Sequence, residues 1–263
     1  MTDWPMHDAL GIDPATDALV ATVGGGGKTT LLFALADERA TPWTPPTTAS
    51  DPPASPRISV LTTTTKFTIP AEAADWPIVF AESRASRAAA IEHAWTHEKS
   101  AIVVGSGRGE RGRVLGVEPD WPQSALAMDI VDFVGVEADG SAGRPFKAPA
   151  EHEPVLPAGV SLAVAVVGVG ALGRSIDVAA VHRPERVRAI VAGDFITPEV
   201  VARVLTDPNG GRKAVPDHAG FAVVVSSAAR DPAGAGAIAE ACHAVGIDVV
   251  VAFDARSGLA ERL

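Results

Sequence analysis

The sequence predicts a three-layer α/β fold built around a mainly parallel β-sheet. Short apolar runs alternate along the chain with stretches of helical periodicity, and the runs are almost continuously apolar. Strands of that composition are buried on both faces, as in parallel sheets that helices cover on each side. One run leads into four glycines, then Lys28-Thr29-Thr30 and an amphipathic segment. This order of strand, glycine loop and helix is typical of phosphate-binding loops, so we expect a P-loop NTPase-like domain.

The length of 263 residues suits one domain of this class, and we predict a single domain over residues 1–263. Residues 41–57 contain six prolines without apolar periodicity, and they are predicted to form an inserted loop. The predicted helices cover 28–39, 84–97, 197–205 and 235–245. The predicted strands cover 19–23, 58–62, 78–80, 102–104, 133–137, 162–167, 221–225 and 249–253.

The charge composition argues against one class of function. The chain has 32 acidic and 22 basic residues, a net charge of −10, and only 5 of the basic residues are lysines. A sequence-independent nucleic-acid binder needs a basic surface, so no nucleic-acid partner is expected. An acidic, lysine-poor surface is typical of proteins kept soluble in high salt, as in halophiles, although a GC-rich genome also exchanges lysine for arginine.

Cysteine usage and hydropathy favour a cytoplasmic protein. The single Cys242 excludes a disulfide framework and any multi-thiolate metal site within one chain. The N-terminus has no basic and apolar leader, so no signal peptide is expected. Residues 154–173 carry no charge over 20 positions, but they contain Pro157 and four glycines. We interpret them as a buried strand and a turn, and expect no membrane span.

The glycine loop is the strongest functional signal. Gly24, Gly25, Gly26 and Gly27 let the backbone turn so that successive N–H groups face an anion at the start of the next helix. Lys28 is predicted to reach the β- and γ-phosphates of ATP or GTP, and the Thr29 hydroxyl to coordinate Mg²⁺, with Thr30 completing the loop. Thr22 occupies the position where the usual motif has its first glycine.

Two further segments follow predicted strands and belong to the same predicted site. After the second strand, Thr64, Thr65 and Lys66 are expected to meet the γ-phosphate and the metal. After the strand at 133–137, Glu137 and Asp139 resemble the carboxylates that bind Mg²⁺ or orient the attacking water. Because side chains alternate along a strand, both should point toward the same site.

A polar loop follows directly at 141–154. Arg144 and Lys147 are predicted to contact the nucleotide or a substrate. Glu151, His152 and Glu153 could supply a metal ligand or a base, or His152 could be an ordinary hydrogen-bonded loop residue. Between 105 and 117, a glycine-rich stretch is predicted to form a β-hairpin or mobile loop, with its arginines as a possible anion-contacting lid. They are Arg108, Arg111 and Arg113.

These segments together resemble the YqeC family, whose members are described as accessory proteins for selenium-dependent molybdenum hydroxylases. The resemblance rests on G-G-G-K-T-T at 25–30, the segments 61–66, 136–154, 182–185 and 196–199, and G-G-R-K-A-V-P at 210–216. It implies a single P-loop domain that binds a nucleoside triphosphate and takes part in the maturation of a molybdenum hydroxylase or its molybdopterin-type cofactor. Together with the predicted Mg²⁺ site, it leads us to expect hydrolysis of ATP or GTP. It also implies a selenium-related context.

Several alternatives stay open. Members of this family often carry Asn-Lys-x-Asp after the strand at 221–225, but this chain has Ser226-Ser227-Ala228-Ala229-Arg230-Asp231. Guanine selectivity is therefore not implied. The nucleotide could also gate a non-hydrolysing scaffold or cofactor-binding protein. Finally, residues 168–173 match G-x-G-x-x-G, a dinucleotide (NAD or FAD) fingerprint, although no helix is predicted directly after them.

Overall fold

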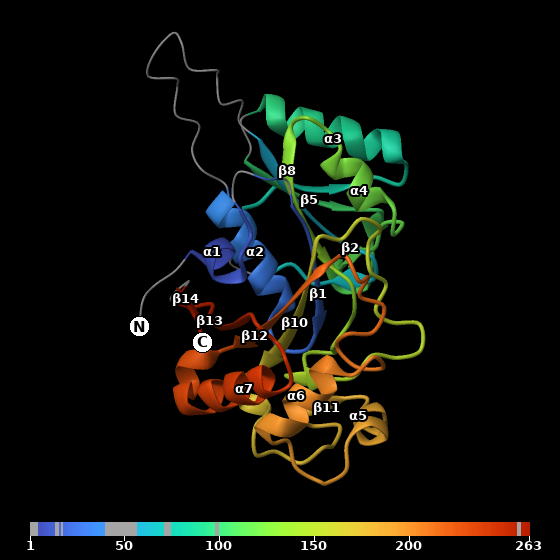
Figure 1. Cartoon of the computed structure of the whole chain (residues 1–263). Coiled ribbons are helices and arrows are strands. Elements are labelled where there is room, and N and C mark those ends of the chain that lie inside the picture. Colours follow the sequence, from blue (N-terminus) through green and yellow to red (C-terminus); the bar gives the residue numbers. More distant parts are fainter. Residues whose placement is uncertain are drawn as a thin grey trace, which may run out of the picture.

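The computed structural model confirms the predicted three-layer α/β fold (Figure 1). It describes residues 5–13, 16, 18–39, 57–70, 75–97, 100–256 and 259–263. The proline-rich loop expected at 41–57 lies outside the described residues, apart from Arg57. No helix in these ranges is long and apolar enough to cross a membrane.

The central sheet has nine strands in the order β14-β13-β12-β10-β1-β8-β2-β5-β4. All neighbouring strands are parallel except β13 and β14, which are antiparallel. The strands are β1 (Ala18–Gly24), β2 (Ile58–Thr63), β4 (Ile78–Phe80), β5 (Ala101–Gly105), β8 (Val131–Glu137), β10 (Leu162–Gly168), β12 (Gly220–Ser226), β13 (Val250–Asp254) and β14 (Leu259–Arg262).

Helices cover both faces of this sheet. On one face α1 and α2 pack over the strands. On the other face α3 and α4 cover one half, and α6 and α7 cover the other. Their bounds, with the short α5, are α1 (Met6–Leu10), α2 (Lys28–Arg39), α3 (Arg84–Thr96), α4 (Trp121–Leu126), α5 (Pro184–Ile190), α6 (Pro198–Thr206) and α7 (Pro232–Ala244).

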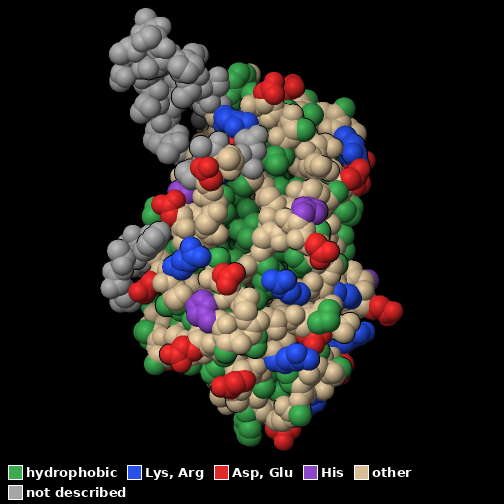
Figure 2. Space-filling view, in the orientation of Figure 1, with side chains coloured by type: hydrophobic (Ala, Val, Ile, Leu, Met, Phe, Trp, Pro, Cys, Tyr) green, Lys and Arg blue, Asp and Glu red, His purple; other side chains and the backbone are tan. Residues whose placement is uncertain are grey.

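Burial on both faces explains the continuous apolar runs. Every residue of β1 is buried, with Val20 packing toward α2 and its neighbours Leu19 and Ala21 packing toward the opposite layer. A strand with that environment needs an apolar residue at each position, because each fully buried Val or Leu contributes about 1.5–3 kcal/mol. On the face shown in Figure 2, acidic and basic side chains are interspersed rather than gathered into one patch.

Two small sheets stand beside the central one. The predicted hairpin at 105–117 is confirmed: β6 (Gly107–Arg108) pairs with β7 (Val114–Leu115), and β7 pairs with β3 (Lys66–Phe67). The second small sheet joins β9 (Phe146–Lys147) to β11 (Val181–His182) in parallel. Both sheets place polar segments that are distant in sequence at one edge of the central sheet.

Candidate functional site

The site lies where the parallel strands of the central sheet end. Since parallel strands end at one edge, the segments after β1, β2, β8, β10, β12 and β13 meet there, as ligand sites in open α/β sheets do. They enclose a large cavity of about 600 Å³ and a small one of about 370 Å³. Both cavities are lined by Gly27, Thr30 and Gly143, so they adjoin at the glycine loop.

The glycine loop needs glycine for steric reasons. Gly24 and Gly26 have φ values of 94° and 83°, in the region that other residues rarely adopt. A Cβ on Gly26 would lie 2.6 Å from the backbone nitrogen of Gly168, and one on Gly24 would collide with the Val166 carbonyl. The loop is also held from β12, because Ser226 Oγ donates a hydrogen bond to the Gly26 carbonyl. Side chains are thus excluded, and the backbone faces the cavities.

The loop and the first turn of α2 present free hydrogen-bond donors. Within the described ranges, the backbone N–H groups of residues 26–30 have no acceptor. By contrast, the Gly25 N–H donates to the Val166 carbonyl, and the Gly24 N–H donates to Asp139 Oδ2. Unpaired N–H groups at the positive end of a helix dipole attract anions. The cavities therefore have an electropositive floor made of backbone.

Lys28 and Thr29 both face the carboxylates that follow β8. Lys28 is 3% exposed; its Nζ donates to the Gly24 carbonyl at 2.7 Å and lies 3.3 Å from Asp139 Oδ1 and 3.9 Å from Glu137 Oε1. Thr29 Oγ1 donates to Glu137 Oε2. Glu137 and Asp139 thus point toward one site, as the alternation of side chains predicts.

The two carboxylates occupy different environments. Glu137 contacts the Thr29 hydroxyl and lines the large cavity, and its burial raises its pKa while the Lys28 ammonium opposes that rise. Asp139 is more deeply placed, since its Oδ2 accepts from the Gly24 N–H at 3.1 Å and lies 2.9 Å from Lys147 Nζ. Its Oδ1 makes no hydrogen bond to the described residues. Glu137 therefore pairs with the Thr29 hydroxyl at the cavity, whereas Asp139 holds the start of the glycine loop through the Gly24 N–H.

Lys147 does not reach the cavity surface. Its side chain is fully buried, and its Nζ contacts three acceptors: the Gly140 carbonyl at 2.7 Å, Asp139 and Glu153 Oε2 at 2.7 Å. Arg183 also donates two hydrogen bonds to the Glu153 carboxylate in a bidentate arrangement, at 2.7 and 3.2 Å. Lys147 thus connects Asp139, through Glu153, to Arg183 after β11. The prediction that Lys147 contacts a ligand is corrected, because its buried ammonium is already bonded within the protein.

Glu153 makes the stability of this network depend on pH. Burial acts to raise its pKa, but hydrogen bonds from Lys147 and Arg183 outweigh burial and hold the pKa at about 2, against 4.5 ordinarily. A lowered folded-state pKa adds stability that is complete above pH 4.5 and is lost as the pH falls toward 2. The shift corresponds to about 3 kcal/mol.

We therefore expect Glu153→Gln to lower the free energy of unfolding at pH 7 by about 3 kcal/mol, and by much less near pH 2. Urea unfolding at several pH values would measure this. The variant should keep some pH dependence of stability between pH 4.5 and 2. It comes from Glu118, because a hydrogen bond from Arg87 lowers the pKa of that carboxyl to about 2. Equal destabilisation of the variant at pH 2 and pH 7 would contradict the assignment.

The threonine run is used mainly for structure. Thr63 Oγ1 donates to the Glu137 carbonyl at 2.7 Å, and Thr64 Oγ1 donates to the Val155 carbonyl at 2.6 Å. Only Thr65 and Lys66 from this part of the prediction line the large cavity. The Thr64 hydroxyl, which was predicted to meet the γ-phosphate, is instead bonded to the backbone at Val155.

The other predicted loop residues divide in the same way. Arg144 is exposed, and it is its backbone that lies against the loop at Gly25. Glu151 and His152 are exposed, whereas their neighbour Glu153 is buried. Arg113 of the hairpin lines the large cavity, as does Arg183, which the site prediction did not include. The only sequence signal for Arg183 was the segment 182–185 in the family resemblance.

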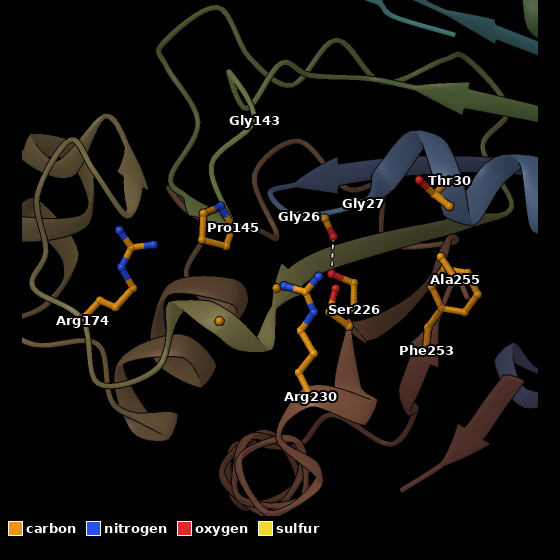
Figure 3. Close-up of a pocket in the computed structure, with 13 residues that line it drawn as sticks. Gly26, Gly27, Thr30, Gly143, Pro145, Arg174, Ser226, Arg230, Phe253 and Ala255 are labelled. Atoms are coloured by element: carbon orange, nitrogen blue, oxygen red, sulfur yellow. Dashed lines mark hydrogen bonds between the residues drawn. The ribbon is translucent and has the colours of Figure 1, made fainter. Parts of the chain in front are cut away.

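The small cavity lies at the ends of β12 and β13 (Figure 3). Ser226 at the end of β12 lines it, as do Ser227 and Arg230 after that strand. Arg174 and Phe253 also line it. Figure 3 shows the guanidinium groups of Arg174 and Arg230 on separate elements beside the cavity. These residues were not among the predicted site residues, because only the folded sheet brings the ends of β10, β12 and β13 to the glycine loop.

Two motifs have structural roles here. Asp231 caps α7 by accepting a hydrogen bond from the Gly234 N–H, so it does not line the small cavity in the position of a base-reading carboxylate. Residues 168–173 contain a single 3₁₀ turn, Val169–Ala171, and do not open an α-helix. The helix start that a dinucleotide fingerprint uses for its pyrophosphate is thus missing at this motif.

Comparison with known proteins places these residues in context. The sequence model of a family described as YqeC protein matches residues 20–185. A protein of Escherichia coli strain K12 named "Uncharacterized protein YqeC" is 31% identical over 204 residues, which cover 75% of this chain and 71% of that protein. No solved structure matches the chain. The family match includes the glycine loop, Glu137 and Arg183, but it ends before the residues of β12 and β13.

Proposed function

The chain belongs to the YqeC family, and we propose that it is a Mg²⁺-dependent nucleoside triphosphatase, using ATP or GTP, that assists the maturation of a molybdenum hydroxylase or its molybdopterin-type cofactor. One observation carries the nucleotide assignment. The unpaired N–H groups of residues 26–30, the Lys28 ammonium and the Thr29–Glu137 pair meet where the two cavities adjoin.

The triphosphate would lie on the glycine loop. Its oxygens would accept the free N–H groups, and Lys28 Nζ would exchange the Gly24 carbonyl for phosphate. The base and ribose would occupy the small cavity beside Ser226, Arg230 and Phe253. A volume of about 370 Å³ lies within the range of small-molecule sites, roughly 300–1,000 Å³.

The residues present fit a magnesium ion that arrives with the nucleotide. Thr29 Oγ1 and the Glu137 carboxylate are adjacent oxygen donors, and Mg²⁺ is usually held by one or two such ligands together with waters and phosphate oxygens. Among the residues that the structure describes, no three His, Cys, Asp or Glu side chains cluster into a metal site. Bound there, the ion would neutralise developing charge on the phosphates.

The chain's own residues would divide the work of hydrolysis. Glu137 would hold water at the metal position, since its carboxylate accepts the hydrogen bond of the Thr29 hydroxyl and lines the large cavity. Lys28 would compensate phosphate charge. Asp139 would keep the loop in place through the Gly24 N–H, without touching the nucleotide.

The test is a multiple-turnover assay of phosphate release with ATP and GTP, with and without Mg²⁺ and with the client hydroxylase added. We expect Glu137→Gln to lower turnover by at least about 100-fold, the scale of losing one well-placed polar group in an active site. Its nucleotide affinity should become nearly independent of Mg²⁺. The exposed Glu151→Gln, which removes the same charge nearby, should behave like the wild type.

Each contrary result has a distinct meaning. Binding without turnover, even with the client present, would replace hydrolysis by a nucleotide-gated scaffold. Full Mg²⁺-dependent turnover by Glu137→Gln would move the metal role to another residue. The accessory role itself rests on family membership, and stimulation of turnover by the immature client, but not by the mature one, is the outcome that would support it.

A further inference from the structure

The large cavity extends well beyond the glycine loop. From the loop it reaches Lys66 on β3, Arg113 directly before β7, and His182 and Arg183 at the end of β11. Its volume of about 600 Å³ is by itself enough for a small-molecule ligand. The proposed nucleotide needs only the part beside Lys28, Thr29 and Glu137, because its base and ribose enter the small cavity.

The outer part of this cavity is positively charged. Lys66, Arg113 and Arg183 line it, and the carboxylate among its lining residues there is Glu153. Glu153 is already compensated by the buried Lys147 as well as by Arg183. A local excess of cations contrasts with the net charge of −10 of the whole chain. Such a concentration of positive charge in a concave site attracts an anionic ligand.

Arg183 is placed so that it could turn toward a ligand without leaving Glu153 unpaired. Its side chain is 23% exposed and lines the large cavity, whereas the Lys147 side chain is fully buried. If Arg183 turned toward a ligand, Glu153 would keep its 2.7 Å contact with Lys147. A planar guanidinium suits phosphate oxygens particularly well, because it donates two parallel hydrogen bonds.

His182 adds a neutral hydrogen-bonding group to this part of the cavity. It lines the same cavity, and burial, followed by the positive charges of Arg183 and Lys147, holds its pKa below the ordinary value. Near pH 7 the ring is therefore neutral and offers one N–H donor beside the cationic side chains.

We propose that this outer part of the large cavity, lined by Lys66, Arg113, His182 and Arg183, binds the phosphomonoester group of a second, small-molecule substrate next to the nucleotide. The proposal rests on the proposed function for its neighbour, the nucleotide. It adds a substrate class that the nucleotide site alone does not require, and it gives the small sheet of β3, β6 and β7 a role in recognition.

The probe is inorganic phosphate, titrated by calorimetry into protein saturated with Mg²⁺ and a non-hydrolysable ATP or GTP analogue. We expect wild-type binding with a Kd on the order of 1 mM, as for a weak single-group ligand. Lys66→Ala combined with Arg113→Ala should weaken phosphate binding at least about tenfold, a larger factor than any loss of affinity for the nucleotide analogue. The matched control is Arg108→Ala combined with Arg111→Ala, which removes two exposed charges from the same hairpin.

The outcomes separate this proposal from the proposed function. No phosphate binding to the saturated protein, equal loss in the control, or a parallel loss of nucleotide affinity would overturn it. A parallel loss of nucleotide affinity would mean that Lys66 and Arg113 bind the triphosphate and not a second substrate. If no nucleotide binds at all, the proposed function fails, and phosphate is titrated into the free protein. Binding that depends on Lys66 and Arg113 but not on Lys28 would then still support the anion site, and its absence would overturn it.

Discussion

Replacing Lys28 by alanine is expected to abolish stabilisation of the protein by nucleoside triphosphates. A ligand present at 100 times its Kd stabilises the native state by about 2.7 kcal/mol, which for a chain of this size raises Tm by roughly 5–10 °C. The wild type should show this rise with Mg²⁺ and ATP or GTP, and Lys28→Ala should show none. Thermal denaturation with ATP, GTP, CTP and NAD⁺, each with and without Mg²⁺, measures the effect and the base preference.

The environment of Lys28 adds a second expected result. Its ammonium lies 3.3 Å from Asp139 and 3.9 Å from Glu137, both nearly inaccessible to solvent. Removing it also destabilises the protein without ligand, by about 1–3 kcal/mol, because buried carboxylates lose a partner. Lys66→Ala, which removes an exposed cation of the same large cavity, is the control and should leave apo stability unchanged. Undiminished stabilisation of Lys28→Ala by ATP and GTP would refute the phosphate site.

Replacing Lys147 by alanine is expected to cause the largest loss of stability of any single change proposed for this chain. The side chain is fully buried, and its ammonium contacts Asp139, Glu153 and the Gly140 carbonyl. Removing one partner of a buried ion pair usually costs about 3–5 kcal/mol. For a chain of this length that corresponds to a Tm lower by roughly 6–20 °C, measured by calorimetry or by urea unfolding.

Lys213→Ala is the matched control for Lys147. Lys213 Nζ donates to two backbone carbonyls, those of Ala150 and Glu151, but it is only partly buried and forms no ion pair with a carboxylate in the part of the chain that the structure describes. Its loss should cost about 1 kcal/mol. If both variants lost the same stability, the buried ion pairs of Lys147 would not be the cause, and the network would have to be reassigned.

Most of the central sheet could be predicted because its determinants are local. Each predicted strand of the sheet is present, and the helices at 28–39 and 197–205 begin within one residue of their predicted start. The short helices α1, α4 and α5 were not predicted. Over one or two turns, apolar periodicity cannot be distinguished from chance, and these helices are held by the layers they pack against.

The candidate site could be predicted only in part. The glycine loop, Lys28 and Thr29 are consecutive in sequence, and their conformation follows from the loop and helix they belong to. Thr64 and Lys147 look like ligand contacts in the sequence, but their hydrogen bonds to Val155 and Glu153 give them structural positions. A polar residue type indicates what a side chain can bond to, but not which partner the fold brings near.

The sequence by itself determined the strand, glycine loop and helix, the parallel sheet and the family, because these depend on residue order and on apolar patterns that act over a few neighbouring positions. Only the tertiary structure decided that Glu137, the last residue of β8, meets Thr29 while Asp139, two residues farther on, accepts from the Gly24 N–H, since alternation predicts only that both side chains point the same way. It also decided that Arg183, 30 residues from Glu153, lines the large cavity. Contacts between such distant residues form only when the sheet brings the ends of its strands to one edge.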